Sequence, residues 1–163
     1  MNQFDLAADV LARNLEMTKM YLEDMSEAEM FARPCGDANH VAWQFGHLAV
    51  AETNMLKSVK PQAAAALPAG FAEKFTKETA RLDDPKAFPS KAEIVGAYIK
   101  AREASIAWAK TLTPADMDKP TDERMRNFAP TVGHVVSMMP LHTMMHIGQL
   151  QVLRRKLGKP VLF

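Results

Sequence analysis

The longest uncharged stretch of this sequence covers 27 residues, from Asn127 to Leu153, and holds no Asp, Glu, Lys or Arg. Such a run is typical either of a membrane-spanning segment or of a helix that is buried on most of its sides. Three histidines, two glutamines and two prolines lie within it, and this polar content is unfavourable in a bilayer. The stretch therefore predicts the central helix of a helical bundle.

The apolar residues of this helix form one stripe, in which positions recur in steps of three and four. Two histidines, His142 and His146, lie in the stripe itself. Residues four apart on a helix share a face and differ in height by about one turn, so both imidazoles can converge on one point. An unpaired buried polar group costs about 1–3 kcal/mol, so the rings are either hydrogen-bonded core histidines or ligands of an ion. The whole stripe consists of Val135, Met139, His142, His146, Leu150, Leu153 and Leu157.

Three further segments share this helical periodicity, and no segment shows the alternation of a strand. Ser90 and Glu93 have the spacing of a capping box, Gly158 is placed to end the last helix, and Pro140 is expected to kink it. The predicted fold class is all-α, a four-helix bundle with long connections after the second and third helices. The expected helices run from Phe4 to Met25, from His40 to Ser58, from Ser90 to Leu112 and from Thr131 to Leu157.

The first long connection, from Lys60 to Pro89, contains prolines that prevent one continuous helix. Connections of this length are usually functional or mobile. It is expected either to cover one end of the bundle or to form a poorly ordered linker.

The composition excludes several classes of protein. The length of 163 residues fits one domain, residues 1–163. With 20 basic and 19 acidic residues the net charge is +1, which argues against a nucleic-acid partner. Asp5 and Asp9 interrupt the apolar run that a signal peptide needs, and the single cysteine, Cys35, cannot form an internal disulfide. We expect a cytoplasmic protein that binds neither nucleic acid nor a membrane.

The helix expected over residues 40–58 is apolar on more than one side, so it lies deep in the bundle or is shared with a second subunit. A homodimer is therefore expected. His40 and His47 share a face of this helix but are separated by about 10 Å along its axis, so they cannot bind one ion. His40 is interpreted as a surface or capping residue, and His47, in the middle of the helix, as a candidate ligand.

Three imidazoles, those of His47, His142 and His146, suit a divalent ion such as Zn²⁺, Ni²⁺ or Fe²⁺. A site with three protein ligands leaves a position for water or substrate, which is the catalytic pattern. Thr143 occupies the position where zinc proteases of the H-E-x-x-H type have a glutamate, so that class is excluded. No glutamate precedes a histidine by three residues, which argues against a carboxylate-bridged di-iron site.

Other polar residues are weaker candidates. His134 lies two turns before His142 and is expected outside the site, while Gln149 is a candidate hydrogen-bond partner of a ligand histidine, or fills a polar gap in the core. Glu52 and Glu103 are possible bases, although a lone glutamate is usually exposed. Cys35 is expected to be an ordinary loop thiol.

Two motifs resemble one known family. N-H-V-A-W-Q-F-G-H-L-A in the second helix and H-T-M-M-H-I-G-Q-L-Q-V-L-R-R-K-L-G in the fourth are similar to the DinB superfamily of bacterial four-helix proteins. The segment D-P-K-A-F-P-S before the third helix fits as well, so the resemblance covers essentially the whole chain.

The resemblance implies a divalent metal held by three histidines, which match His47, His142 and His146. It also implies frequent dimers, and relatives that include metal-dependent transferases and isomerases using thiols such as bacillithiol and mycothiol. Relatives often show H-H-R-G-Q where this chain has Met145-His146-Ile147-Gly148-Gln149, so a contact with an anionic substrate at the arginine position is in doubt.

These observations lead to three hypotheses. The first is a metal-dependent enzyme, of the thiol S-transferase type, whose metal activates a thiol or water. The second is a non-catalytic stress-response protein that binds a metal or small ligand, and the third is a metal-free bundle with satisfied core histidines.

Overall fold

The computed structural model describes residues 2–162 and contains four α-helices and no β-strand in that range. The all-α prediction is therefore confirmed. The helices are α1 (Gln3–Glu23), α2 (Val41–Lys57), α3 (Lys91–Ala109) and α4 (Val132–Lys156).

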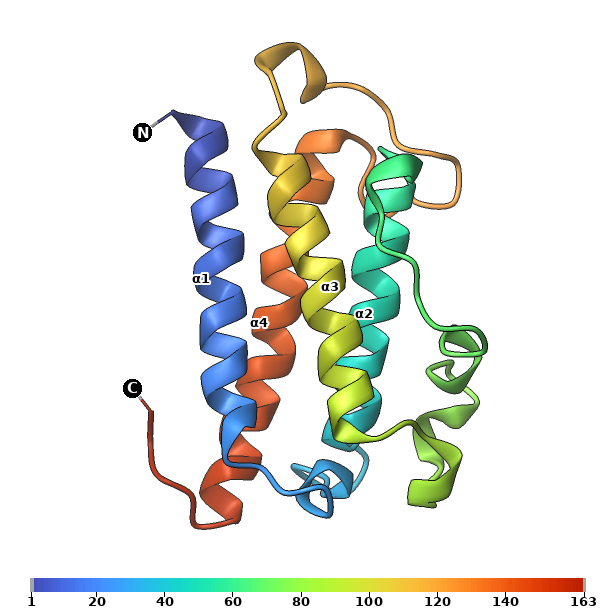
Figure 1. Cartoon of the computed structure of the whole chain (residues 1–163), viewed down its shortest axis with the longest axis vertical. Helices are drawn as coiled ribbons and strands as arrows, with labels where there is room; N and C mark the ends of the chain where they lie inside the picture. Colours follow the sequence, from blue (N-terminus) through green and yellow to red (C-terminus); the bar gives the residue numbers. More distant parts are fainter. Residues whose placement is uncertain (1, 163) are drawn as a thin grey trace.

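The chain direction of the helices explains the long connections. In Figure 1, α1 and α4 run toward the bottom of the molecule, while α2 and α3 both run toward the top. Because α2 and α3 are parallel, residues 58–90 must return along the whole bundle to reach the start of α3. Each of α3 and α4 packs against both α1 and α2.

The helix ends lie within three residues of those expected, and local capping explains them. Ser90 accepts from the Glu93 N–H while the Glu93 carboxylate accepts from the Ser90 N–H, so the predicted capping box starts α3. Gly158 adopts φ +70° just after α4, a conformation that a glycine takes at little cost. Pro140 is accommodated inside a continuous α4.

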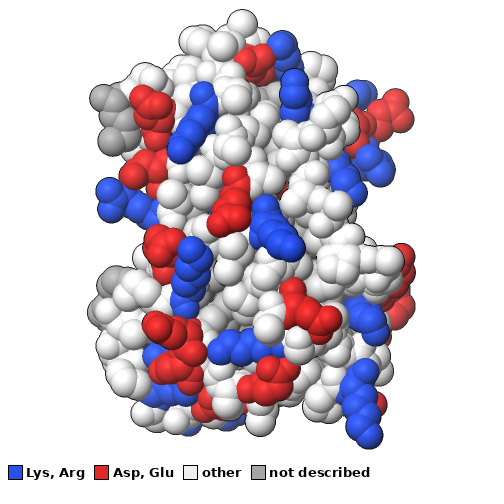
Figure 2. Space-filling view, in the orientation of Figure 1, with Lys and Arg blue, Asp and Glu red and all other residues white. Residues whose placement is uncertain are grey.

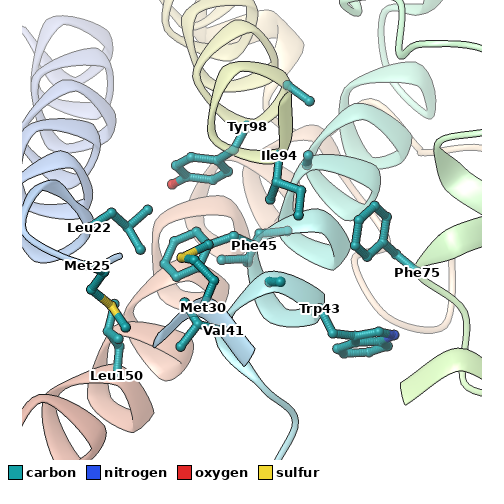
Figure 3. Packing of buried hydrophobic residues seen from close by; sticks show 14 of the residues in the cluster. Leu22, Met25, Met30, Val41, Trp43, Phe45, Phe75, Ile94, Tyr98 and Leu150 are labelled. Carbon is teal, nitrogen blue, oxygen red and sulfur yellow. The ribbon is translucent and has the colours of Figure 1, made fainter. Parts of the chain in front are cut away.

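The helices enclose two apolar clusters, one toward each end of the bundle. Phe45, which is fully buried, meets Tyr98 of α3 edge-on at a ring distance of 5.8 Å, and both are seen with Ile94 at the centre of Figure 3. The second cluster includes Leu11, Met55 and other residues near the start of α1 and the end of α2. Between the clusters, α2, α3 and α4 carry buried and half-buried polar residues, and this polar layer contains the predicted site. Its members are the buried Glu52, Arg102 and Thr143 and the half-buried His47, His142 and His146.

The connection from α2 to α3 is packed and is not a loose linker. It lies along the side of α2 (Figure 1), so the expectation that it covers one end of the bundle is wrong. Three phenylalanines, Phe71, Phe75 and Phe88, bury their rings in the first apolar cluster. Apolar burial of this size holds the segment in place without regular secondary structure.

The surface carries charges of both signs. On the face shown in Figure 2, acidic and basic side chains are interspersed and no large patch of one sign forms. Among residues 2–162, no helix combines the length and the hydropathy that crossing a membrane requires.

Candidate metal centre

Three histidines from two helices meet at one point of the bundle. His47 lies on α2, and His142 and His146 lie one turn apart on α4. The Nε2 atom of His142 is 3.3 Å from Nε2 of His47 and 3.3 Å from Nε2 of His146. One ring nitrogen from each residue lies within 4.8 Å of the other two, so the three could hold a metal ion.

The spacing of the His142 nitrogen from each of its two neighbours fits a bound ion. Two imidazole nitrogens that are each about 2.0–2.1 Å from a zinc ion, at the tetrahedral angle, lie about 3.3 Å apart. Hydrogen bonding accounts less well for the contacts, because one His142 Nε2 atom would have to serve two neighbouring ring nitrogens.

Gln44 sets the tautomer of one of these rings. Its side-chain Nε2 donates to the carbonyl of Asn39 at 2.6 Å, which leaves its Oε1 facing Nδ1 of His146 at 2.9 Å. An amide oxygen only accepts, so Nδ1 of His146 must carry the proton, and its Nε2 presents a lone pair toward His142. Metal-binding histidines are commonly oriented by such a bond at the other nitrogen.

Trp43 orients the ring of His47. The two rings stack with centroids 4.9 Å apart and an interplanar angle of 6°. The Trp43 indole N–H donates to the Thr76 carbonyl and to the Thr79 hydroxyl, both at 3.1 Å. The α2–α3 connection therefore helps to position a candidate ligand.

Burial keeps the three imidazoles neutral. It lowers the pKa of His47 to about 4 and that of His146 to about 3, with a smaller effect from neighbouring histidines. Burial also lowers the pKa of His142, and the positive charge of Arg102 adds to this effect. Only a neutral imidazole has a lone pair for a metal, so at neutral pH the site is ready to bind one.

A buried ion pair lies in the polar layer beside the histidines. The Arg102 Nη2 atom donates to Glu52 at 2.9 Å and to the Thr143 hydroxyl at 2.8 Å, and Tyr98 contacts the same hydroxyl at 3.1 Å. Glu52 and Arg102 are both essentially inaccessible to solvent. Burial raises the pKa of Glu52, which opposes its ionisation. The network joins α2 and α3 to the helix turn that carries His142.

A pocket of about 400 Å³ opens directly onto the site. His47 and His142 form part of its wall. The remaining lining residues are Val50, Ala51, Asn54, Met55, Met125 and Phe128.

The other sequence candidates lie away from the histidines or have different roles. His40 caps α2, which agrees with the capping interpretation, but it is fully buried and not at the surface. His134 is exposed, bonded to Thr131 and outside the cluster. Gln149 is exposed, so neither the ligand-orienting role nor the core role expected for it is right. Cys35 is an exposed free thiol.

Sequence reasoning missed the roles of three polar residues. Gln44 precedes His47 by three residues, which places it on the same helix face and was the available signal. Glu52 was expected at the surface, which is wrong, and no role was predicted for Arg102, which is also buried. Glu52 follows the core residue Leu48 by four positions, and Arg102 follows the core residue Tyr98 by four. Opposite charges at core positions of two helices indicate a buried ion pair.

Comparison with known families agrees with this geometry. A family model described as the DinB superfamily matches residues 11–150, which include all three histidines, Gln44 and every residue of the pocket wall. The chain belongs to the DinB superfamily. No curated protein and no solved structure matches this DinB protein. The superfamily assignment agrees with the four-helix fold and with a site able to hold a metal.

Proposed function

We propose that this DinB protein is a metal-dependent enzyme of the thiol S-transferase type. His47, His142 and His146 would hold a divalent ion, with Zn²⁺, Ni²⁺ and Fe²⁺ as the candidates. The observation that carries the proposal is the convergence of three Nε2 atoms, at least one of which Gln44 holds in the metal-binding tautomer.

When bound by three histidines, such an ion lowers the pKa of a thiol or water and supplies a nucleophile at neutral pH. The residues of the chain supply the rest of the site. Gln44 and Trp43 fix the directions of two imidazoles, and the pocket beside His47 and His142 receives the second reactant.

The reaction joins a thiol sulfur to an electrophilic carbon. The sulfur lone pair forms the new S–C bond, the electron pair of the breaking bond departs with the leaving group, and the thiol proton passes to solvent. Among residues 2–162, no carboxylate lines the pocket. Glu103 is exposed and Glu52 is paired with Arg102, so neither glutamate is proposed as a base.

The test combines metal analysis with an assay of conjugation. Purified protein is loaded with Zn²⁺, Ni²⁺ or Fe²⁺, and the conjugation of bacillithiol or mycothiol to monochlorobimane is followed by fluorescence. The proposal predicts faster conjugation with the loaded wild type and loss of this effect in His142→Ala. Stoichiometric metal without conjugation of either thiol would support the non-catalytic binding protein instead.

A further inference from the structure

One wall of the pocket beside the histidines is formed by a single face of α2. His47, Val50, Ala51, Asn54 and Met55 are spaced by three, four, seven and eight residues from the first, which places them on one helix face. This face explains part of the two-sided apolar character of α2. One apolar side packs in the core, and the other lines the pocket.

The opposite wall comes from the connection between α3 and α4. Met125 and Phe128 belong to a tight turn, in which the N–H groups of Phe128 and Ala129 both donate to the Met125 carbonyl, at 2.9 and 2.8 Å. The Asp122 N–H donates to the Ser58 carbonyl at 3.1 Å, which ties the turn to the end of α2. The wall is therefore fixed relative to α2.

The chemistry of the lining selects a class of ligand. Among the described residues that line the pocket, Asn54 is the one polar side chain apart from the two histidines, and no Asp, Glu, Lys or Arg is included. The phenyl ring of Phe128 is at the rim, and the residue is 56% exposed, so a ligand can bury apolar surface against it. The volume of about 400 Å³ lies in the range of small-molecule sites.

We infer that this pocket binds the uncharged, apolar part of the electrophilic substrate and not the thiol. The assignment of an electrophile rests on the proposed function. A charged group placed against these side chains, away from the histidines, would lose its hydration without gaining an ionic partner among them. Bacterial thiols such as bacillithiol and mycothiol are polar and sugar-bearing, and Asn54 alone cannot replace their hydration. At the position after His146, Ile147 is buried in the core and offers no cation to an anionic substrate.

A matched pair of fluorescent probes tests the ligand class. N-phenyl-1-naphthylamine is neutral, and 8-anilino-1-naphthalenesulfonate has the same aromatic skeleton with a negative charge. Both are titrated into wild type from which metal has been removed, so that a bound ion does not attract the sulfonate. We expect the neutral probe to bind about tenfold more tightly or better, because the sulfonate finds no cationic side chain among the lining residues. Equal or tighter binding of the sulfonate would overturn the inference.

Three variants test whether the neutral probe binds in this pocket. Phe128→Ala removes an exposed rim residue without disturbing the core, and it should weaken binding of the neutral probe about fivefold or more. Ala51→Phe should fill the pocket and block binding. Leu141→Ala is the matched control, because Leu141 is 58% exposed but is not in the pocket lining, and it should leave affinity unchanged. If the control weakens binding as much as Phe128→Ala does, or if Phe128→Ala has no effect, the inference is wrong.

Metal content, measured on the same proteins after separate loading with the ion, separates this inference from the proposed function. Each pocket variant should retain the metal content of the wild type, since none alters a histidine. Loss of probe binding with metal retained is the result expected of Ala51→Phe. Probe binding in a wild type that never takes up metal would contradict the proposed function but would still support an apolar ligand pocket. Stoichiometric metal in a wild type that binds neither probe would contradict the pocket alone.

Discussion

At the scale of single residues, the site depends on side chains that hold the histidines in one orientation. Gln44 is the clearest case, because both ends of its amide are engaged, one by the Asn39 carbonyl and the other by His146. The amide therefore cannot rotate without losing two hydrogen bonds.

Replacing Gln44 should weaken metal binding. Gln44→Ala removes the acceptor that keeps the proton on Nδ1 of His146, and loss of such a partner typically lowers metal affinity about 10–100-fold. Competition with a chelator of known affinity measures the change. Gln149→Ala is the control, since Gln149 is exposed and should have no effect. Equal metal affinities for Gln44→Ala and the wild type would refute this role.

His40 is a buried histidine in which one ring nitrogen accepts a hydrogen bond and the other donates one. Nδ1 accepts from the Trp43 N–H at 3.0 Å, and Nε2 donates to the Leu82 carbonyl at 3.1 Å. Burial, helped by the charge of nearby Arg33, lowers its pKa to about 4, against smaller opposing effects of Leu82 and Asp83. A second proton would destroy the N-cap bond to Trp43.

This arrangement predicts a pH-dependent stability. Unfolded His40 takes up a proton near pH 6.5, whereas folded His40 does so only near pH 4. Between these values the unfolded state binds more protons, so stability is full above about pH 6.5 and falls as pH is lowered toward 4, by up to about 1.4 kcal/mol per pH unit. Urea unfolding of the wild type and of His40→Asn at several pH values measures how the free energy of unfolding depends on pH. The stability difference between the two should shrink with falling pH, and a constant difference would contradict the prediction.

At the scale of elements, the packing of the α2–α3 connection depends on a helical glycine. A Cβ atom built on Gly46 would lie 2.1–2.3 Å from three ring atoms of Phe75, which is itself buried. The close approach lets the connection lie against α2 near Trp43, and so near His47.

Gly46→Ala should therefore destabilise the protein even though alanine favours a helix. The gain in helix propensity is about 1 kcal/mol, while overpacking a filled site costs typically about 1–3 kcal/mol. Gly96→Ala in α3 is the control, because nothing lies within 4 Å of its added Cβ, and it should be neutral or stabilising. Thermal unfolding compares the two. Partial recovery in Gly46→Ala/Phe75→Leu would identify the clash as the cause, and a stabilised Gly46→Ala protein would exclude it.

The four helices could be predicted from the sequence, but their packing against one another could not. The helices were predictable because their apolar stripes are regular and their caps are encoded locally, as at Ser90 and Gly158. The proximity of His142 and His146 follows from helix geometry alone. Their meeting with His47 could only be proposed, because it depends on how α2 packs against α4. The path of residues 58–90 was not predictable, since it follows from non-local burial of phenylalanine rings and from the direction of α3.

At the scale of the whole molecule, one outer surface is apolar. The exposed residues Leu141, Met144, Met145 and Val152 lie along α4, in the uncharged stretch that marks the sequence. The expected homodimer stays a prediction, and we propose that this surface forms its contact. Light scattering should then give the mass of two chains for the wild type and of one chain for Met145→Glu. A monomeric wild type at micromolar concentration would contradict it.

The central claim is that three histidines of one chain hold a divalent ion. Its most direct test is the metal content of purified wild type and His146→Ala, measured by mass spectrometry after loading with Zn²⁺, Ni²⁺ or Fe²⁺. We predict about one ion per wild-type chain. Binding should be weaker in the variant by more than the roughly 10–100-fold that loss of an orienting residue costs. A wild type that holds no stoichiometric metal after loading would contradict the claim and leave a metal-free bundle with core histidines.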